Sequence, residues 1–151
     1  MNKIKSAAVL IKKLSNLKDF DIPAYQSDEA GGVDLSASIE QPVKILPWER
    51  EIIPCGISLS MPRGLEAQIR PRSGLAFKHG ITILNTPGTI DSDYRGEIKI
   101  VLINLSKKEF LIQPKDRIAQ MIFSEVTQVT FKEVDDLDST NRGIDGFGST
   151  G

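Results

Sequence analysis

The sequence predicts an all-β fold, a jelly-roll-like β-barrel or sandwich with one short helix and a flexible C-terminal arm. Short runs of β-favouring residues recur along the chain, and each ends at a turn former, which is typical of an all-β domain. Several runs alternate apolar and polar side chains, as residues 65–69 do, so that one face of each strand can be buried. The prolines fall at or near the ends of these runs, where a missing N–H does least harm to a strand ladder.

The expected elements follow in chain order. The strands are residues 7–10, 43–46, 52–61, 65–69, 81–84, 97–105, 110–112, 118–123 and 126–134. Between the fourth and the fifth, Ser73 can cap a helix of one or two turns, and Gly80 stands where a glycine would end it. From Asp135 the alternation stops, and the chain is first acidic and then rich in glycine. We therefore expect a β domain at residues 1–134 and a flexible arm at residues 135–151.

Composition excludes several classes of protein. Apolar residues make up 40% of the 151 positions, which suits a folded domain with one core. The 19 basic and 20 acidic residues nearly cancel, so no nucleic-acid partner is expected. No run approaches the roughly 20 apolar residues of a membrane span, and the apolar run at residues 7–11 is too short for a secretion signal. With one cysteine, Cys55, an internal disulfide is excluded, and we expect a core thiol in a cytoplasmic protein.

Candidate chemistry lies in five segments where small, flexible residues stand beside charged ones. They are residues 30–35, 71–76, 88–97, 117–122 and 142–151. In the second, Arg72, Ser73 and Gly74 offer a planar cation, a hydroxyl and backbone N–H groups, which suit a phosphate. Alternatively, Ser73 merely caps the helix and Arg72 pairs with a surface carboxylate. In the third, Asp91 and Asp93 share one face of an extended chain. Either can act as a general base or help to place a metal, or the two can form only a polar turn.

The last segment contains the letters of a dinucleotide fingerprint at Gly146, Gly148 and Gly151, but the strand and helix that this motif needs are missing. The segment is better interpreted as a pliable arm that carries one cation, Arg142, and one aromatic ring, Phe147. Such an arm can fold over a nucleotide, with the guanidinium on a phosphate and the ring on the base. A single histidine, His79, excludes any site that needs two imidazoles, and we expect it at the surface near the helix end.

In this order and at these spacings, the five segments closely resemble those of the trimeric deoxyuridine triphosphatases (dUTP diphosphatases), over roughly residues 30–151. The resemblance implies a β jelly roll and a homotrimer whose active sites form between subunits, with the C-terminal arm closing over a neighbour's site. It also implies hydrolysis of the substrate dUTP to dUMP and diphosphate. That reaction would lower dUTP and supply dUMP for thymidylate synthesis.

The resemblance further assigns roles to individual residues. Asp91 would orient and activate the water that attacks the α-phosphorus in line, and it is preferred to Asp93 for this role. The uracil pocket would be built from Asn85 and the backbone of a hairpin at residues 81–91, and Tyr94 would lie under the deoxyribose. The full set of implied substrate contacts, besides Asp91, is Arg72, Ser73, Gly74, Asn85, Gly88, Thr89, Ile90, Tyr94, Lys99, Gln120, Arg142, Phe147, Gly148 and Ser149.

A divalent cation is expected because a triphosphate brings about four negative charges, more than Arg72 and Arg142 can neutralise. Mg²⁺ fits best, because it keeps several waters and is held mostly by substrate phosphates. No direct protein ligand is expected, and Asp34 and Gln120 would act through water or by supporting the site. One departure from the family pattern is Asp145, an anion close to the place where phosphates should arrive, which could slow closure of the arm.

Three alternatives remain at this point. The first is a dCTP deaminase relative, which would need a glutamate placed to work on the cytosine ring. The second is a catalytically inactive, nucleotide-binding regulatory trimer, which loss of Asp91, Arg72 or the arm would signal; all of these are present. The third is a structural jelly roll such as a coat protein, against which the phosphate-directed segments argue.

Overall fold

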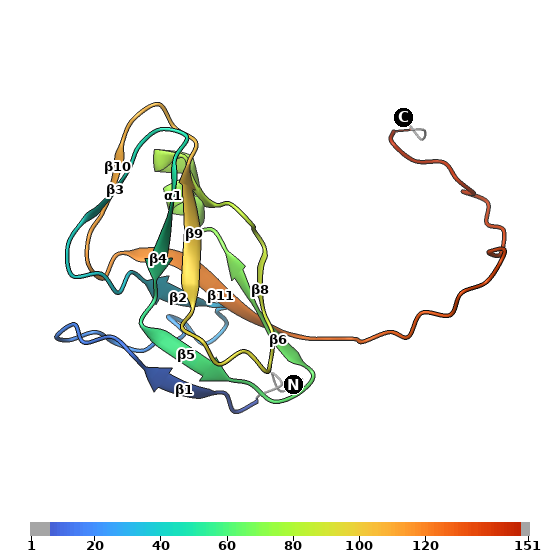
Figure 1. Cartoon of the computed structure of the whole chain (residues 1–151), viewed down its shortest axis with the longest axis horizontal. Coiled ribbons are helices and arrows are strands. Elements are labelled where there is room, and N and C mark those ends of the chain that lie inside the picture. The colour runs from blue at the N-terminus through green and yellow to red at the C-terminus, as the bar shows by residue number, and fades with distance from the viewer. Residues whose placement is uncertain (1–6, 149–151) are drawn as a thin grey trace.

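The computed structural model describes residues 7–148 and confirms the all-β, jelly-roll-like fold with one short helix (Figure 1). The elements are β1 (Leu10–Lys13), β2 (Val33–Ser36), β3 (Val43–Ile45), β4 (Arg50–Pro54), β5 (Ile57–Ser60), β6 (Leu65–Arg70), α1 (Ser73–His79), β7 (Ile81–Ile83), β8 (Gly88–Ile90), β9 (Lys99–Asn104), β10 (Phe110–Ile112) and β11 (Arg117–Glu125). Within the described residues, no helix is long and apolar enough to cross a membrane.

The strands form four small antiparallel sheets. The largest has the order β2-β11-β6-β8, and a second has the order β4-β9-β7. Strands β1 and β5 form one pair, and β3 and β10 form another. The inward faces of these strands contribute aliphatic side chains to one continuous buried cluster. Along β2 and β9, buried residues alternate with less buried ones. Every second side chain of these strands therefore points into the core.

The predicted strand at residues 52–61 is wrong in one respect, because the structure divides it into β4 and β5 at Gly56. That glycine has a φ of 65°, and a Cβ there would lie 2.7 Å from Ser15 Cβ and from Ser38 Oγ. The backbone oxygen of Gly56 also accepts bonds from the N–H groups of Leu14 and Ser15. A turn that needs a left-handed backbone and a close approach excludes a side chain, so the run cannot continue straight through it.

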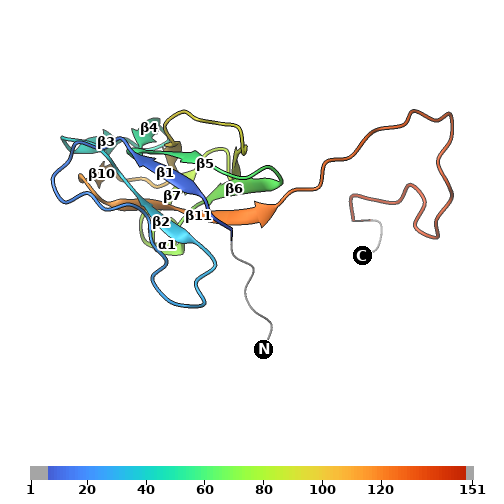
Figure 2. The ribbon, with the colours of Figure 1, turned by 90° about the horizontal axis from the view of Figure 1, so that it is seen from below.

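Other strands also differ from the prediction. The first strand begins at Leu10 rather than at residue 7, and β2 and β8 lie in segments whose glycines obscured them. Residues 126–134, predicted as a strand, have no regular structure and are exposed. They follow β11 directly and run away from the body of the molecule (Figure 2). Their apolar side chains therefore find no strand neighbour among the described residues of this chain.

The short helix is confirmed, but its cap is not. Arg72 occupies the N-cap position, no side chain caps the helix, and Ser73 is the first helical residue. The predicted end at Gly80 is confirmed, because this glycine has a φ of 65° and its N–H donates to the carbonyl of Ala76. His79 is exposed beside it, as expected, with its ring 5.1 Å from that of Phe110. The Ser73 hydroxyl is not used as a helix cap.

Cys55 is buried in the core, as the sequence predicted. Burial, and after it the charge of Glu97, raises the pKa of the thiol from 9.0 to about 12. Since the thiolate is the reactive form, we expect a disulfide reagent at pH 8 to modify the native chain at least about 100-fold more slowly than the chain in urea. The measurement is the release of the chromophore with time. Equal rates in the two states would show that Cys55 is accessible in the folded protein.

Candidate functional site

Side chains from three of the predicted segments meet at one end of the largest sheet. Asp34 Oδ1 lies 3.1 Å from Arg72 Nε, and its Oδ2 lies 3.1 Å from Arg117 Nη1. Arg72 Nη1 donates to the backbone oxygen of Arg117 over 2.9 Å, and Gln120 Nε2 donates to the carbonyl of Pro71 over 2.9 Å. We call Asp34, Arg72, Arg117 and Gln120 the Asp34 cluster. A carboxylate held between two guanidinium groups fixes both cations at the surface.

The sheet explains why these residues meet. Strand β11 lies between β2 and β6, and Gln120 on β11 pairs with Asp34 on one side and Arg70 on the other. Strand β6 ends at Arg70, so Arg72, two positions later, lies at the same end of the sheet as Gln120 and Asp34. The register between β11 and β2 shifts between Arg117 and Ala119. Such a bulge re-aims side chains, and Arg117 lies in reach of the Asp34 carboxylate.

Arg117 is a site residue that sequence reasoning did not identify. The segment 117–122 stands out because small residues lie beside a charged one, and the resemblance assigns a role to Gln120 there but none to Arg117. Its contact with Asp34 depends on the pairing of β11 with β2, because the two residues lie 83 positions apart in the chain. The Ser73 side chain and Gly74 lie exposed in the first turn of α1, next to Arg72. Their N–H groups precede the first intrahelical bond, which runs from Ala76 to Arg72.

A second group of predicted residues lies on and after β8. Gly88 is buried, and a Cβ there would lie 3.3 Å from Ile69 Cβ and 3.6 Å from Asn85 Nδ2. Thr89 is exposed, and Ile90 is half-buried. The predicted hairpin at residues 81–91 is wrong in its pairing: β7 belongs to the sheet with β9, whereas β8 pairs with β6. The segment around Asn85 is therefore a corner between two sheets.

Residues 91–97, which we call the Asp91 loop, form most of the connection from β8 to β9. The N–H of Tyr94 donates to the carbonyl of Asp91 over 3.1 Å, and Arg95 Nη1 donates to the carbonyl of Ser92 over 2.6 Å. The Tyr94 hydroxyl donates to the carbonyl of Glu97 over 3.1 Å. Asp91 is exposed and lines a cavity of about 720 Å³ together with Asp93. Lys99, at the start of β9, is also exposed.

The Asp34 cluster and the Asp91 loop lie at opposite ends of β6. Asp91 follows Ile90, which pairs with Ala67 near the start of β6, whereas Arg72 lies two positions beyond Arg70, the last residue of that strand. At about 3.3 Å per residue, the two groups are separated by roughly 15 to 20 Å along the strand. In Figure 1, α1 and the connection from β8 to β9 accordingly lie at opposite ends of the body. One chain therefore does not bring the predicted base next to the predicted phosphate-binding residues.

The arm residues lie away from both groups. Arg142 Nε donates to the carbonyl of Asp145 over 2.9 Å, and the N–H of Gly143 donates to Thr140. Phe147 is fully exposed, with a φ of 51°, and Gly148 follows with a φ of 87°. Ser149, the last predicted contact, lies outside the described residues. Figure 2 shows the arm extending far from the sheets, so the structure leaves the arm apart from the other predicted contacts.

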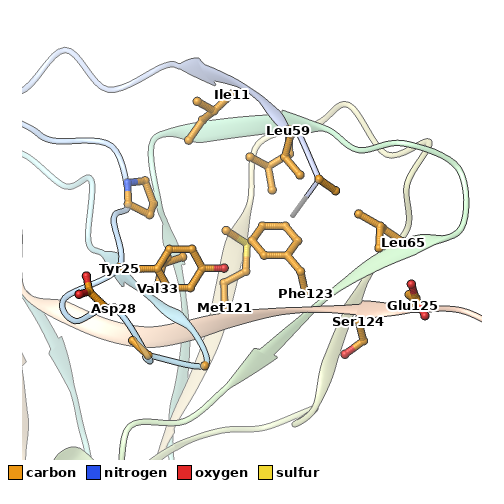
Figure 3. Close-up of a pocket in the computed structure, with 15 residues that line it drawn as sticks. Ile11, Tyr25, Asp28, Val33, Leu59, Leu65, Met121, Phe123, Ser124 and Glu125 are labelled. Carbon is orange, nitrogen blue, oxygen red and sulfur yellow. The ribbon is translucent and has the colours of Figure 1, made fainter. Parts of the chain in front are cut away.

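A third feature is an apolar groove of about 940 Å³ that contains none of the predicted contact residues. Figure 3 shows Met121 and Phe123 rising from β11 toward Leu59 on β5 and Ile11 on β1, with Tyr25 at one side. A groove lined mainly by hydrocarbon offers little to a triphosphate, which needs cations and N–H donors. We therefore place the candidate site at the Asp34 cluster and the Asp91 loop rather than in the larger cavity.

The fold and its two polar groups define an all-β barrel that presents fixed guanidinium groups and an exposed carboxylate loop. A family model described as dUTPase matches residues 18–151. The chain is 52% identical over 139 residues to the deoxyuridine 5'-triphosphate nucleotidohydrolase of Cytophaga hutchinsonii, covering 92% of this chain and 90% of that protein. It is 49% identical over 150 residues to the protein of the same name from Maricaulis maris, covering 98% and 99% of the two chains. The chain belongs to the dUTPase family.

Solved structures show the same fold. The dUTPase of Staphylococcus bacteriophage 80alpha, solved with dUpNHpp, matches with a TM-score of 0.83 at 23% identity, over 97% of this chain and 99% of that one. A variant dUTPase of phage phi11 of S. aureus matches with a TM-score of 0.78 at 20% identity, over 88% of this chain and all of that one, and is described with a structural Mg(II) ion. The jelly-roll-like arrangement predicted from the sequence is therefore confirmed.

Proposed function

We propose that this chain hydrolyses dUTP to dUMP and diphosphate at sites shared between subunits of a homotrimer. One observation carries the proposal: each chain has both halves of such a site, but at opposite ends of β6. The half with the arginines is the Asp34 cluster, and the half with the carboxylate base is the Asp91 loop. Membership of the dUTPase family supplies the substrate. Lowering dUTP while supplying dUMP for thymidylate synthesis is the cellular role that follows, and we assign the protein to the cytoplasm.

The chemistry begins with Asp91. Its carboxylate accepts a proton from a water molecule and aims that water at the α-phosphorus, in line with the bond to the departing diphosphate. Asp91 suits this role because it is exposed and directly follows β8, whose Gly88 is buried against the sheet. Its backbone carbonyl accepts the N–H of Tyr94, which holds the turn that presents the carboxylate. Asp93 lies in the same cavity and is the second choice for the base.

The phosphates bind to the other half of the site. Arg72 already has its orientation fixed by Asp34, so little side-chain freedom is lost when an anion arrives. Ser73 and Gly74 add a hydroxyl and backbone N–H groups, and Gln120 holds the backbone of this segment through Pro71. As negative charge moves onto the diphosphate, these fixed donors stabilise it without reorganising.

Uracil and deoxyribose bind near the Asp91 loop. Asn85 and the backbone of Gly88, Thr89 and Ile90 present donors and acceptors at the corner between β7 and β8, which suits the edge of uracil and opposes that of cytosine. Tyr94 lies under the sugar and leaves no room for a 2′-hydroxyl, and Lys99 lines the same region. The arm then closes over the bound nucleotide.

The role of the arm rests on its exposed groups. Arg142 places its guanidinium on the γ-phosphate, Phe147 stacks on the uracil ring, and Gly148 and Ser149 complete the cover. Because the Nε of Arg142 is bonded to the carbonyl of Asp145, closure has to exchange that bond for one to a phosphate. Asp145 adds an anion beside the incoming phosphates and so opposes closure.

The homotrimer is supported by surfaces that one chain leaves uncovered. The apolar groove between β1, β5 and β11 is open (Figure 3), and Phe131, beyond β11, is 93% exposed. Ile52 on β4 is 61% exposed and pairs across the sheet with another apolar residue, Val101. An apolar pair at a solvent-facing position of a strand is typical of a surface that a partner covers. A second copy of the chain can cover such surfaces and at the same time bring an Asp91 loop to an Asp34 cluster.

Mg²⁺ is part of the proposal. Among residues 7–148 no three His, Cys, Asp or Glu side chains gather to hold a metal ion. Asp34 has the hard oxygen atoms that Mg²⁺ prefers, but both are bound by arginines. These residues fit an ion held mainly by the substrate phosphates, with Asp34 and Gln120 reaching it through water. When bound, the ion supplies charge that stabilises the triphosphate and the departing diphosphate.

The test is product formation by the purified chain with Mg²⁺ in ¹⁸O-labelled water, comparing dUTP with dCTP, dTTP and UTP at equal concentration. We expect dUMP and diphosphate from dUTP alone, with the label in dUMP. Label in the diphosphate would overturn attack at the α-phosphorus. Tight binding of dUTP without turnover would indicate the inactive regulatory trimer, and release of ammonia from dCTP would indicate the deaminase.

A further inference from the structure

The backbone that follows Tyr94 leaves no room for a side chain. A Cβ on Gly96 would overlap the Tyr94 hydroxyl oxygen and would lie 2.6 Å from Cζ and 3.0 Å from Cε2 of the ring. The phenol therefore lies directly against the Gly96 backbone. This glycine is required for close approach rather than for an unusual backbone angle. Any side chain at this position would have to displace the ring.

The phenol is also held from its polar end. Its hydroxyl donates to the carbonyl of Glu97 over 3.1 Å. The Glu97 carboxylate in turn accepts the N–H of Gly56 over 3.0 Å, at the turn between β4 and β5. Next to it, the N–H of Ile98 donates to the carbonyl of Ile57, and the N–H of Cys55 donates to the carbonyl of Ile98, both over 2.9 Å. The acceptor for the phenol is therefore attached to the buried core.

We propose that Gly96 and Glu97 are positioning residues that fix the Tyr94 ring and thereby set the discrimination between deoxyribose and ribose substrates. This inference rests on the proposed function, in which Tyr94 lies under the sugar. A ring excludes one extra hydroxyl only if it cannot yield, because a small displacement would open enough space for an oxygen atom. Gly96 allows the ring to reach its place, and Glu97 connects its hydroxyl to the turn at Gly56.

The test compares kcat/KM for dUTP with kcat/KM for UTP in full-length variants. Tyr94→Ala is the reference for loss of the ring. We expect Gly96→Ala to lower the dUTP to UTP ratio by about tenfold or more, and Glu97→Ala to lower it by a smaller factor. Glu97→Gln is the matched control, because its amide oxygen can still accept the N–H of Gly56. That variant is expected to restore the ratio to within about threefold of the original.

The ratio separates positioning from general damage, because a merely destabilised enzyme loses activity on both nucleotides alike. Thermal unfolding of each variant confirms that it is folded. A Gly96→Ala variant that is folded and keeps the original ratio, while Tyr94→Ala loses it, would overturn the inference and leave the proposed function intact. An original chain that does not prefer dUTP to UTP, or a Tyr94→Ala variant that keeps the preference, would instead overturn the role of Tyr94 in the proposed function.

Discussion

Asp91→Asn is expected to lower the turnover of dUTP by about 100-fold or more while leaving its binding within about tenfold. Asparagine has nearly the same shape as aspartate, and the bond from the Tyr94 N–H goes to the backbone carbonyl of residue 91, so the loop keeps its turn. What the amide lacks is the basicity to take a proton from water. The measurement is single-turnover hydrolysis beside equilibrium binding of dUTP.

Asp93→Asn is the matched control for that substitution. It removes the same charge from the same cavity but leaves the proposed base in place. We expect its effect on turnover to be much smaller than that of Asp91→Asn. Unchanged turnover in Asp91→Asn would remove this residue from the mechanism, and the larger loss in Asp93→Asn would transfer the role of base to Asp93.

Deleting residues 142–151 is expected to leave folding intact and to reduce turnover by about 100-fold or more, which is the scale for losing oriented phosphate contacts and exclusion of water. In the described part of this segment, Arg142 bonds with Asp145 and Gly143 bonds with Thr140, so these hydrogen bonds run within the arm. Because these bonds of the described residues 142–148 stay within the arm, we expect the core to keep its stability when the segment is removed. The measurements are thermal unfolding and steady-state hydrolysis of dUTP.

Two single substitutions test individual residues of the arm. Arg142→Met removes the cation proposed for the γ-phosphate, and it should reproduce much of the loss seen on deletion. Asp145→Asn removes the anion that opposes phosphate binding, and it should raise kcat/KM rather than lower it. If the truncated chain retains full activity, the arm is an ordinary exposed end and both substitutions should be neutral.

The predictable parts of the fold are those whose pattern is local. Strands β6, β9 and β11 alternate or run apolar over enough residues to be predicted, although their ends shift. Strands β2 and β8, of four and three residues, follow or contain glycines, so their pairing depends on neighbours rather than on propensity. Residues 126–134 have strand-like composition but belong to no sheet among the described residues. In their case a local pattern was not enough, because a strand also needs a partner.

For the site, the segments were predictable and their arrangement was not. Arg72, Gln120 and Asp34 were chosen from three separate segments, and the structure brings them together through the order of β2, β11 and β6. Arg117 was missed because its partner lies far away in the chain. The positions of Gly96 and Glu97 against Tyr94 depend on a turn near residue 56, and no local spacing carries that information.

The separation of Asp91 from Arg72 gives the sharpest test of the central claim that each site is built from more than one subunit. Chains carrying Asp91→Asn and chains carrying Arg72→Met are unfolded, mixed in equal amounts and refolded together, and dUTP hydrolysis is compared with that of the original chain treated in the same way. Each variant alone is expected to be nearly inactive. If the two residues of a site come from different subunits, random assembly gives about one quarter of the sites an intact pair, and the mixture should recover about one quarter of the original activity. If both come from one chain, no site is intact, and a mixture as inactive as its components would contradict the claim.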